Sequence, residues 1–226
     1  MFRKGSWLVA ALALLAVAPV ANAAGGWTIS LNGGLGIPTG DFKDSLEAKS
    51  GPQFALDICY HLSDMFAVGV DGGMNQNKHG FEGDVEDLGN GATLTANKDK
   101  FIAWHAGVHG KYMVPMQGKV HPYGVLGVGI YNLKEDYEYT FNDGAGTIVT
   151  FTDEGDEAAG NFEQPGSRLG GRIGLGAMYQ ATGQVGVGIE ADYNMITMDK
   201  DKFDVSSLQY VTVRAVVSYN LMAMGQ

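Results

Sequence analysis

Cysteine, basic residues and long apolar segments are all scarce in this sequence of 226 residues. Cys59 is the single cysteine, so no internal disulfide can form, and hydrogen bonds and packing must hold the fold. There are 15 basic residues against 25 acidic ones, a balance that disfavours nucleic acid as a partner because phosphate binding needs a basic surface. After the N-terminal segment, no apolar run approaches the ~20 residues that a membrane-spanning helix needs.

The N-terminus has the parts of an export signal. A positively charged start precedes an apolar run at residues 7–17, and Ala21-Asn22-Ala23 forms a small-x-small cleavage site. We therefore predict a signal peptide at residues 1–23, cleaved on export, with an uncleaved anchor as the alternative. The mature chain, residues 24–226, has the usual size of a single all-β barrel domain, about 200 residues.

Residues 185–195 alternate strictly between two kinds of side chain. Every second residue from Val185 to Met195 is apolar, and the residues between them are glycine, carboxylate or amide. Period-two alternation is typical of a two-faced strand, and the length fits the ~9–11 tilted residues with which a strand crosses a bilayer. A soluble barrel would turn the apolar row inward, whereas a membrane barrel turns it toward lipid.

Seven further segments alternate in the same way, which predicts eight strands. The predicted strands are residues 27–37, 53–62, 65–75, 101–114, 120–133, 168–179, 185–195 and 208–221. Short turns alternate with loops of roughly 15, 25 and 35 residues, and the last connection is intermediate. This is typical of an outer-membrane barrel with short periplasmic turns and long extracellular loops, and it places both mature termini in the periplasm.

Aromatic residues decide between the soluble and the membrane barrel. Six of them stand on apolar rows near the predicted periplasmic ends: Trp27, Tyr60, Phe66, Tyr112, Tyr179 and Tyr219. Amphipathic rings collect at membrane interfaces, and a soluble barrel has no reason to produce such an aromatic girdle. We therefore predict an all-β fold, an eight-stranded antiparallel up-and-down transmembrane β-barrel.

These residues also carry a resemblance. The segment Ser-Leu-Asn-Gly-Gly-Leu-Gly-Ile-Pro-Thr-Gly-Asp-Phe at 30–42, the Gly-x-Gly strand centres and the eight strands resemble the small outer-membrane β-barrel domain family, which includes the transmembrane domain of outer membrane protein A and outer membrane protein X. The resemblance implies the outer membrane of a Gram-negative type bacterium, with outer-membrane lipid, lipopolysaccharide and the barrel assembly machinery as partners, and we expect a monomer. It departs at the C-terminus, because such barrels commonly end on an aromatic residue and this chain continues through residues 222–226.

Charged residues also fall on the rows predicted to face the lumen. This expected lumenal network consists of Asp57, Asp71, Lys111, Arg172, Glu190, Asp192 and Arg214. The short turn after the sixth strand predicts Arg172 opposite Asp192, and the last loop predicts Glu190 near Arg214. Because an eight-stranded barrel has room only for side chains, the network favours a polar plug over a gate or ion path.

Two of these carboxylates are predicted to face each other. Asp57 and Asp71 lie across one tight turn, where like charges need a partner. We expect inward Lys111, Arg172 or Arg214 to reach toward them, or one carboxyl to stay protonated.

Other chemistry receives little support. His105 and His109 are four residues apart on one strand, about 13 Å, too far for a single ion, and the lumen or its rim is the ordinary place for them. Nothing in the sequence supports a cross-strand site with His121. The glycine cluster at 33–36 leads into no helical pattern and fails as a dinucleotide fingerprint. We therefore predict no catalytic residues, no metal and no cofactor.

The third long loop, residues 134–167, is strongly acidic. Apolar and aromatic residues flank its segment 142–146 and predict a hairpin that projects beyond the membrane. The loop is either a solvated surface, an exposed strand edge for a surface ligand, or a site bridged to lipopolysaccharide by divalent cations.

Three functions are compatible with these features. The first is a non-enzymatic outer-membrane protein for envelope structure and surface interaction through its acidic loops. The second is a small pore or a transporter of small or apolar solutes. The third is a membrane-embedded lipid-modifying enzyme, which would need a serine, histidine and acid set, and neither His105 nor His109 has a serine two residues away.

Overall fold

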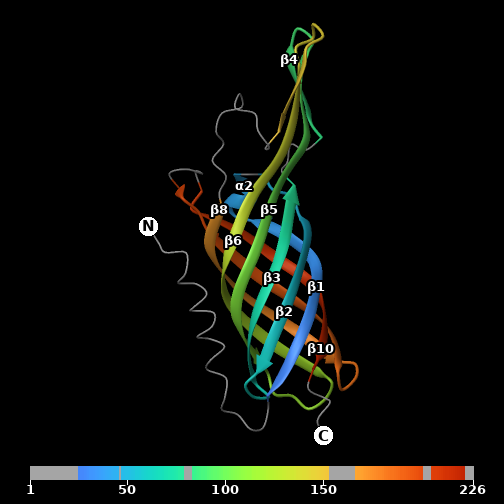
Figure 1. The fold of residues 1–226 in the computed structure, drawn as a ribbon, viewed down its shortest axis with the longest axis vertical. Helices are drawn as coiled ribbons and strands as arrows, with labels where there is room; N and C mark the ends of the chain where they lie inside the picture. The colour runs from blue at the N-terminus through green and yellow to red at the C-terminus, as the bar shows by residue number, and fades with distance from the viewer. Residues whose placement is uncertain (1–24, 46, 79–82, 153–165, 201–204, 222–226) are drawn as a thin grey trace.

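Eight antiparallel strands form a closed barrel in the computed structural model, which describes residues 25–45, 47–78, 83–152, 166–200 and 205–221 (Figure 1). The barrel strands are β1 (Gly26–Thr39), β2 (Gly51–His61), β3 (Phe66–Lys78), β5 (Ala92–Met113), β6 (Val120–Asn142), β8 (Gly166–Gln180), β9 (Val185–Thr197) and β10 (Ser207–Asn220). Each pairs with its neighbour in the chain order, and β10 pairs with β1 to close the sheet. The predicted fold and all eight strands are confirmed. The predicted signal peptide lies outside the described residues.

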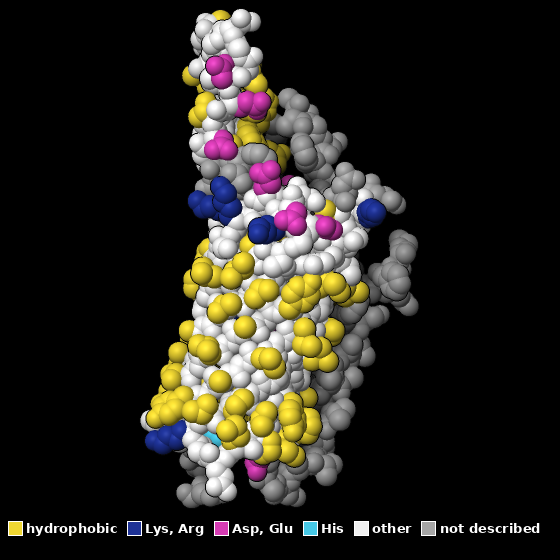
Figure 2. Space-filling model, turned by 180° about the vertical axis from the view of Figure 1, so that it is seen from behind, with side chains coloured by type: hydrophobic (Ala, Val, Ile, Leu, Met, Phe, Trp, Pro, Cys, Tyr) yellow, Lys and Arg dark blue, Asp and Glu magenta, His cyan; other side chains and the backbone are white. Residues whose placement is uncertain are grey.

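The side chains of the barrel strands face as predicted, with the apolar rows outward and the polar rows inward. On β9, Val187 and Ile189 are 41% and 68% exposed, whereas Glu190 and Asp192 are 3% and 1% exposed. Figure 2 shows the consequence, a broad band of hydrophobic side chains on the outside of the barrel. A barrel with its apolar side chains outside and its charges inside is built to stand in lipid.

The strands β5 and β6 are longer than predicted and rise beyond the barrel. β3 pairs with β5 only as far as Lys100, while the β5–β6 pairing continues to Thr93 and Asn142. Two short strands, β4 (Val85–Gly89) and β7 (Ile148–Thr152), flank this part. We call the resulting four-stranded sheet the extension; it is the narrow projection above the barrel in Figure 1.

The extension both confirms and corrects the loop prediction. The hairpin predicted around residues 142–146 is present, since β6 pairs with β7 across it. The segments before 101 and after 133, which the alternation predicts as loops, are instead parts of β5 and β6. Away from lipid, a strand no longer needs strict alternation, so the sequence pattern weakens where the strands continue.

The short helix α2 (Asp41–Asp44) lies over the loop end of the barrel (Figure 1). Its Phe42 is 1% exposed and meets Phe101 edge to face, with ring centroids 5.3 Å apart. The surrounding buried residues, Ala48, Ala103, Tyr131, Leu133, Ile196, Val205, Leu208 and Tyr210, complete an apolar cap over the lumen. No helix within the described ranges has the length and hydropathy to span a bilayer.

Candidate functional site: the lumenal polar network

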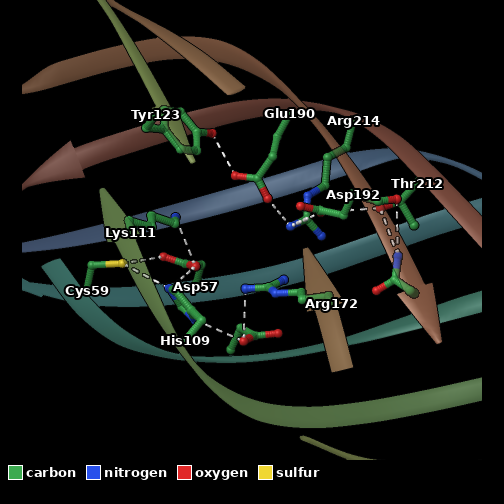
Figure 3. Close-up of polar contacts among 12 residues, drawn as sticks. Asp57, Cys59, His109, Lys111, Tyr123, Arg172, Glu190, Asp192, Thr212 and Arg214 are labelled. Carbon is green, nitrogen blue, oxygen red and sulfur yellow. Dashed lines mark hydrogen bonds and ion pairs between the residues drawn. The ribbon is translucent and has the colours of Figure 1, made fainter. Parts of the chain in front are cut away.

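Below the apolar cap, charged side chains from β2, β3, β5, β8, β9 and β10 fill the bore (Figure 3). They form two groups that meet across the lumen. One group centres on the carboxylates of β2 and β3, and the other on those of β9. With the exception of the half-buried Lys111, the seven charged residues expected here are buried.

The first group holds Asp57 and Asp71, which are opposite each other in the β2–β3 register as expected. Lys111 Nζ donates to Asp57 Oδ2 at 3.1 Å, and Arg172 Nη2 crosses the lumen from β8 to donate to Asp71 Oδ1 at 3.1 Å. His109 lies between the two carboxylates, with Nε2 3.0 Å from Asp57 Oδ2 and Nδ1 3.0 Å from Asp71 Oδ1. Because an ionised carboxylate only accepts hydrogen bonds, this geometry suits a His109 imidazolium that donates from both nitrogens.

Two further side chains join the first group. The Cys59 thiol donates to Asp57 Oδ1 at 3.0 Å, and its sulfur is 3.3 Å from His109 Nε2. His105 Nε2 is 2.9 Å from Asp71 Oδ2, so Asp71 has three nitrogen partners. Sequence reasoning gives neither histidine a role and does not include Cys59 in the network.

The second group is built on Arg214. It lies opposite Glu190 in the β9–β10 register, where we expected it, and Nη2 contacts both Glu190 Oε1 and Asp192 Oδ2, the latter at 2.7 Å. Tyr123 OH reaches from β6 to donate to Glu190 Oε2 at 2.6 Å, and Thr212 donates to Asp192 at 3.3 Å. One guanidinium thus lies between two buried carboxylates, so that both carboxylates have a cationic partner.

One register prediction is wrong. Arg172 lies opposite Asn194, two residues from the predicted Asp192. The cause is the β8–β9 turn, in which the Thr182 hydroxyl accepts hydrogen bonds from the backbone N–H groups of Gln184 and Val185. Gln180 pairs with Gly186, so the turn is centred one residue further along the chain than the prediction assumes and the register moves by two residues. Arg172 still faces the lumen and reaches Asp71 on β3.

Glycine explains how side chains two strands apart can touch. Cys59 is opposite Gly69, and Gly69 is opposite His109, so thiol and imidazole meet above a residue with no side chain. A methyl group added at Gly69 would lie 2.7 Å from His109 Nε2. Gly176 plays the same part between Tyr123 and Glu190. Rows in which glycine alternates with a large polar residue let the network cross the bore.

A cavity of about 140 Å³ lies between the first group and the turn end of the barrel. Cys59, Lys111 and Tyr123 belong both to its lining and to the network. Its remaining walls include His61, His121, Met113 and Met178. The bore therefore has three levels, namely the apolar cap, the ion pairs and this small cavity.

The predicted aromatic girdle stands on the outer face at the turn end. Trp27 pairs with Tyr60, with ring centroids 5.0 Å apart, and Phe66 pairs with Tyr112 at 5.1 Å. The other two members, Tyr179 and Tyr219, are likewise on the outer face and partly exposed. The Lys119 ammonium lies 6.0 Å from the Tyr179 ring centroid, which places a cation beside the girdle.

Comparison with known proteins agrees with this architecture. Among solved structures, Neisserial surface protein A aligns with a TM-score of 0.51 at 14% identity, covering 85% of this chain and 96% of that one. Ail of Yersinia pestis aligns at 0.43 and 17% identity, covering 87% and 99%, and a major outer membrane protein of Thermus thermophilus aligns at 0.43 and 12%, covering 86% and 99%. A search of curated proteins gave no significant match. Residues 7–220 match the outer membrane protein beta-barrel domain, so this chain belongs to that family of outer-membrane proteins.

Proposed function

We propose that this outer-membrane barrel is a non-enzymatic surface protein whose extension binds a partner outside the cell. The observation that carries the proposal is the extension itself. It is a four-stranded sheet beyond the lipid-facing band, and within the described residues β4 and β7 form its two outer edges. A sheet edge presents unpaired backbone N–H and C=O groups that can receive an added strand.

The side chains at these edges favour a particular kind of partner. Val85 on β4 and Ile148 on β7 are 61% and 65% exposed, although both are large and apolar. Glu86 and Asp87 stand on β4 and are exposed as well, and Figure 2 shows acidic groups along the extension. We therefore propose a protein or peptide that adds an extended segment with apolar and basic side chains. The acidic residues between 153 and 165 lie outside the described residues.

The filled bore supports display rather than transport. Buried ion pairs cross the lumen at one level, and the cap around Phe42 covers it at another. Among the described residues, His105 and His109 contact carboxylates, and His109 also contacts a thiol, so neither is paired with a serine nucleophile. This supports a non-enzymatic protein.

The proposed orientation places the extension outside the cell and both ends of the barrel chain in the periplasm. Trp27 near the start of β1 and Asn220 at the end of β10 lie at the turn end, opposite the extension. Protease added to whole cells should cut at the exposed tips near Asn90 and Gly144, and permeabilised cells should be needed for cuts at the barrel's turns. Cleavage at the barrel's turns alone in intact cells would show that the protein has the opposite orientation.

Binding can be tested with the full protein in lipid nanodiscs and a synthetic peptide of alternating Lys and Val as the probe. We expect binding by the wild-type protein, little binding of an alternating Glu and Val peptide, and loss of binding in Ile148→Lys and Val85→Lys variants. Ala145→Lys is the matched control, because it adds the same charge in the turn between β6 and β7, outside both edge strands. Equal binding by wild type and the two edge variants would refute the proposal.

A further inference from the structure

We propose that the first group of the lumenal network is a binding site for a divalent cation of the Zn²⁺ type, with Asp57, Cys59 and His109 as the three protein ligands. These residues offer a carboxylate oxygen, a thiolate sulfur and an imidazole nitrogen within 4.8 Å of one another, and all three are buried. Oxygen, nitrogen and sulfur are the three donor types that zinc accepts in proteins.

The distances between the donor atoms are close to those of a tetrahedral site. Cys59 Sγ lies 3.0 Å from Asp57 Oδ1 and 3.3 Å from His109 Nε2, and the second oxygen of Asp57, Oδ2, lies 3.0 Å from His109 Nε2. Zinc bond lengths of about 2.0–2.3 Å in tetrahedral geometry separate such donors by about 3.3–3.6 Å. The three side chains would need to move apart by only about half an ångström.

His109 is also held as metal-bound histidines are held. Its Nδ1 faces Asp71 Oδ1 at 3.0 Å, which leaves Nε2 for the ion. Asp71 is in turn fixed by Arg172 at 3.1 Å and by His105 at 2.9 Å. A carboxylate on the second nitrogen of a histidine ligand orients the ring and raises its basicity. Asp71 would thus be a positioning residue for the site.

The charges around the site can accommodate a dication. The thiol and the imidazolium would each release a proton on binding, so that one divalent ion replaces two protons and the lumen keeps its net charge. Asp57 can bind through Oδ1, the oxygen that faces Cys59, while Oδ2 keeps its ion pair with Lys111. The buried carboxylates of the network remain compensated in both states.

An entry path leads to the ligands from the turn end. Cys59 forms part of the wall of the cavity of about 140 Å³, which has room for water as a fourth ligand. His61, His121, Met113 and Met178 line the same cavity and offer further nitrogen and sulfur donors along the way. The site is separate from the extension, so it does not depend on the proposed surface function.

Cobalt is the direct probe, because Cys59 is the only cysteine and any thiolate-to-metal charge-transfer band must come from it. The full mature barrel, folded in detergent and kept reduced and chelator-washed, is titrated with Co²⁺. We expect one equivalent to produce a near-ultraviolet charge-transfer band together with strong visible bands of tetrahedral cobalt, and Zn²⁺ to abolish both. Absence of the charge-transfer band in the folded wild type at several equivalents of Co²⁺ would overturn the site.

Variants then separate ligands from their surroundings. Cys59→Ser should remove the charge-transfer band and weaken Zn²⁺ binding in calorimetry by at least about tenfold, and Asp71→Asn should keep the band while weakening binding about 10–100-fold. Ser218→Ala, in the cavity wall but outside the ligand set, is the control and should bind as wild type does. Unchanged Zn²⁺ affinity in folded Cys59→Ser would refute the proposal.

A measurement on the wild type covers the case in which a variant does not fold. One equivalent of Zn²⁺ should slow alkylation of Cys59 by a small thiol reagent at least about tenfold, while leaving heat-modifiable migration of the barrel on gels unchanged. An alkylation rate that Zn²⁺ does not alter would count against the site, whatever the variants do.

Discussion

Replacing Gly176 by alanine tests whether glycine is what allows the network to cross the bore. Gly176 stands between Tyr123 and Glu190 in one cross-strand row. A methyl group there would lie 2.5 Å from the hydroxyl oxygen of Tyr123 and closer still to its Cζ, far inside contact distance. The ring must therefore move, and its 2.6 Å hydrogen bond to Glu190 must lengthen or break.

The magnitude follows from these two effects. Overpacking a well-packed interior costs about 1–3 kcal/mol, and losing a hydrogen bond to a charged group costs about 1.5–3 kcal/mol. Since a moving ring relieves part of the clash, we expect Gly176→Ala to lower the free energy of unfolding by about 2–5 kcal/mol. In an ordinary strand the same change would be neutral or stabilising, because glycine weakens a strand interior.

A double-mutant cycle in urea, followed by tryptophan fluorescence in lipid vesicles, isolates the effect of the ring. In a Tyr123→Ala background the obstacle is gone, so Gly176→Ala should cost less than about 1 kcal/mol. Gly183→Ala in the β8–β9 turn is the matched control, because nothing lies within 4 Å of an added methyl group there. If Gly176→Ala costs the same in both backgrounds, the ring is not the cause and the account of glycine rows is wrong.

Three other outcomes follow from the same structure. Arg214→Ala leaves two buried carboxylates without their cation and should lower the free energy of unfolding by about 3–5 kcal/mol. Arg214→Lys should be less damaging, and the refolding yield and the urea midpoint of each variant measure the effect. Planar-bilayer recordings should show negligible conductance for wild type, for Arg214→Ala and for Phe42→Ala. Each variant disrupts only one of the two closures of the bore, the ion pairs or the apolar cap, and the other remains. Open-channel steps in either variant would contradict this. In the extension, burial and the 2.5 Å hydrogen bond to Asp99 raise the pKa of Tyr139 above its usual value. Its contribution to stability is therefore complete below about pH 10 and lost as the pH rises toward the higher folded-state pKa, so Asp99→Asn should move the ultraviolet tyrosinate titration to lower pH.

The barrel wall was predictable from the sequence because lipid imposes a strict rule on it. Every second residue of a spanning strand must be apolar. The alternation through Ile189 and Glu190 therefore identifies the strand and shows which side chains face lipid and which face the lumen. The extension does not obey this rule, since both faces of β4 and β7 meet water. Only the hairpin around residues 142–146 is recognisable there, through its aromatic flanks.

Register alone predicts the lumenal contacts between directly neighbouring strands. For Asp57 and Asp71 the prediction left three possible partners, Lys111, Arg172 and Arg214, and the first two reach them. Asp57 and Asp71, or Glu190 and Arg214, follow from register alone. The contact of Arg172 with Asp71 depends instead on which strands face each other across the closed barrel, and alternation carries no information about that. The β8–β9 turn also lies one residue further along the chain than the prediction assumes, so the cross-strand neighbour of Arg172 is Asn194 rather than Asp192.

The glycine content has a physical explanation in these contacts. A bore of eight strands is too narrow for large side chains on every strand at one level, yet buried charges need partners to offset their desolvation. Placing glycine at 69 and 176 resolves the conflict, because each large polar residue reaches over a bare backbone to the next strand but one. The same arrangement that makes the lumen a dense plug also brings Cys59 and His109 within 3.3 Å, so the donors of the proposed metal site come together as a consequence of how the bore is filled.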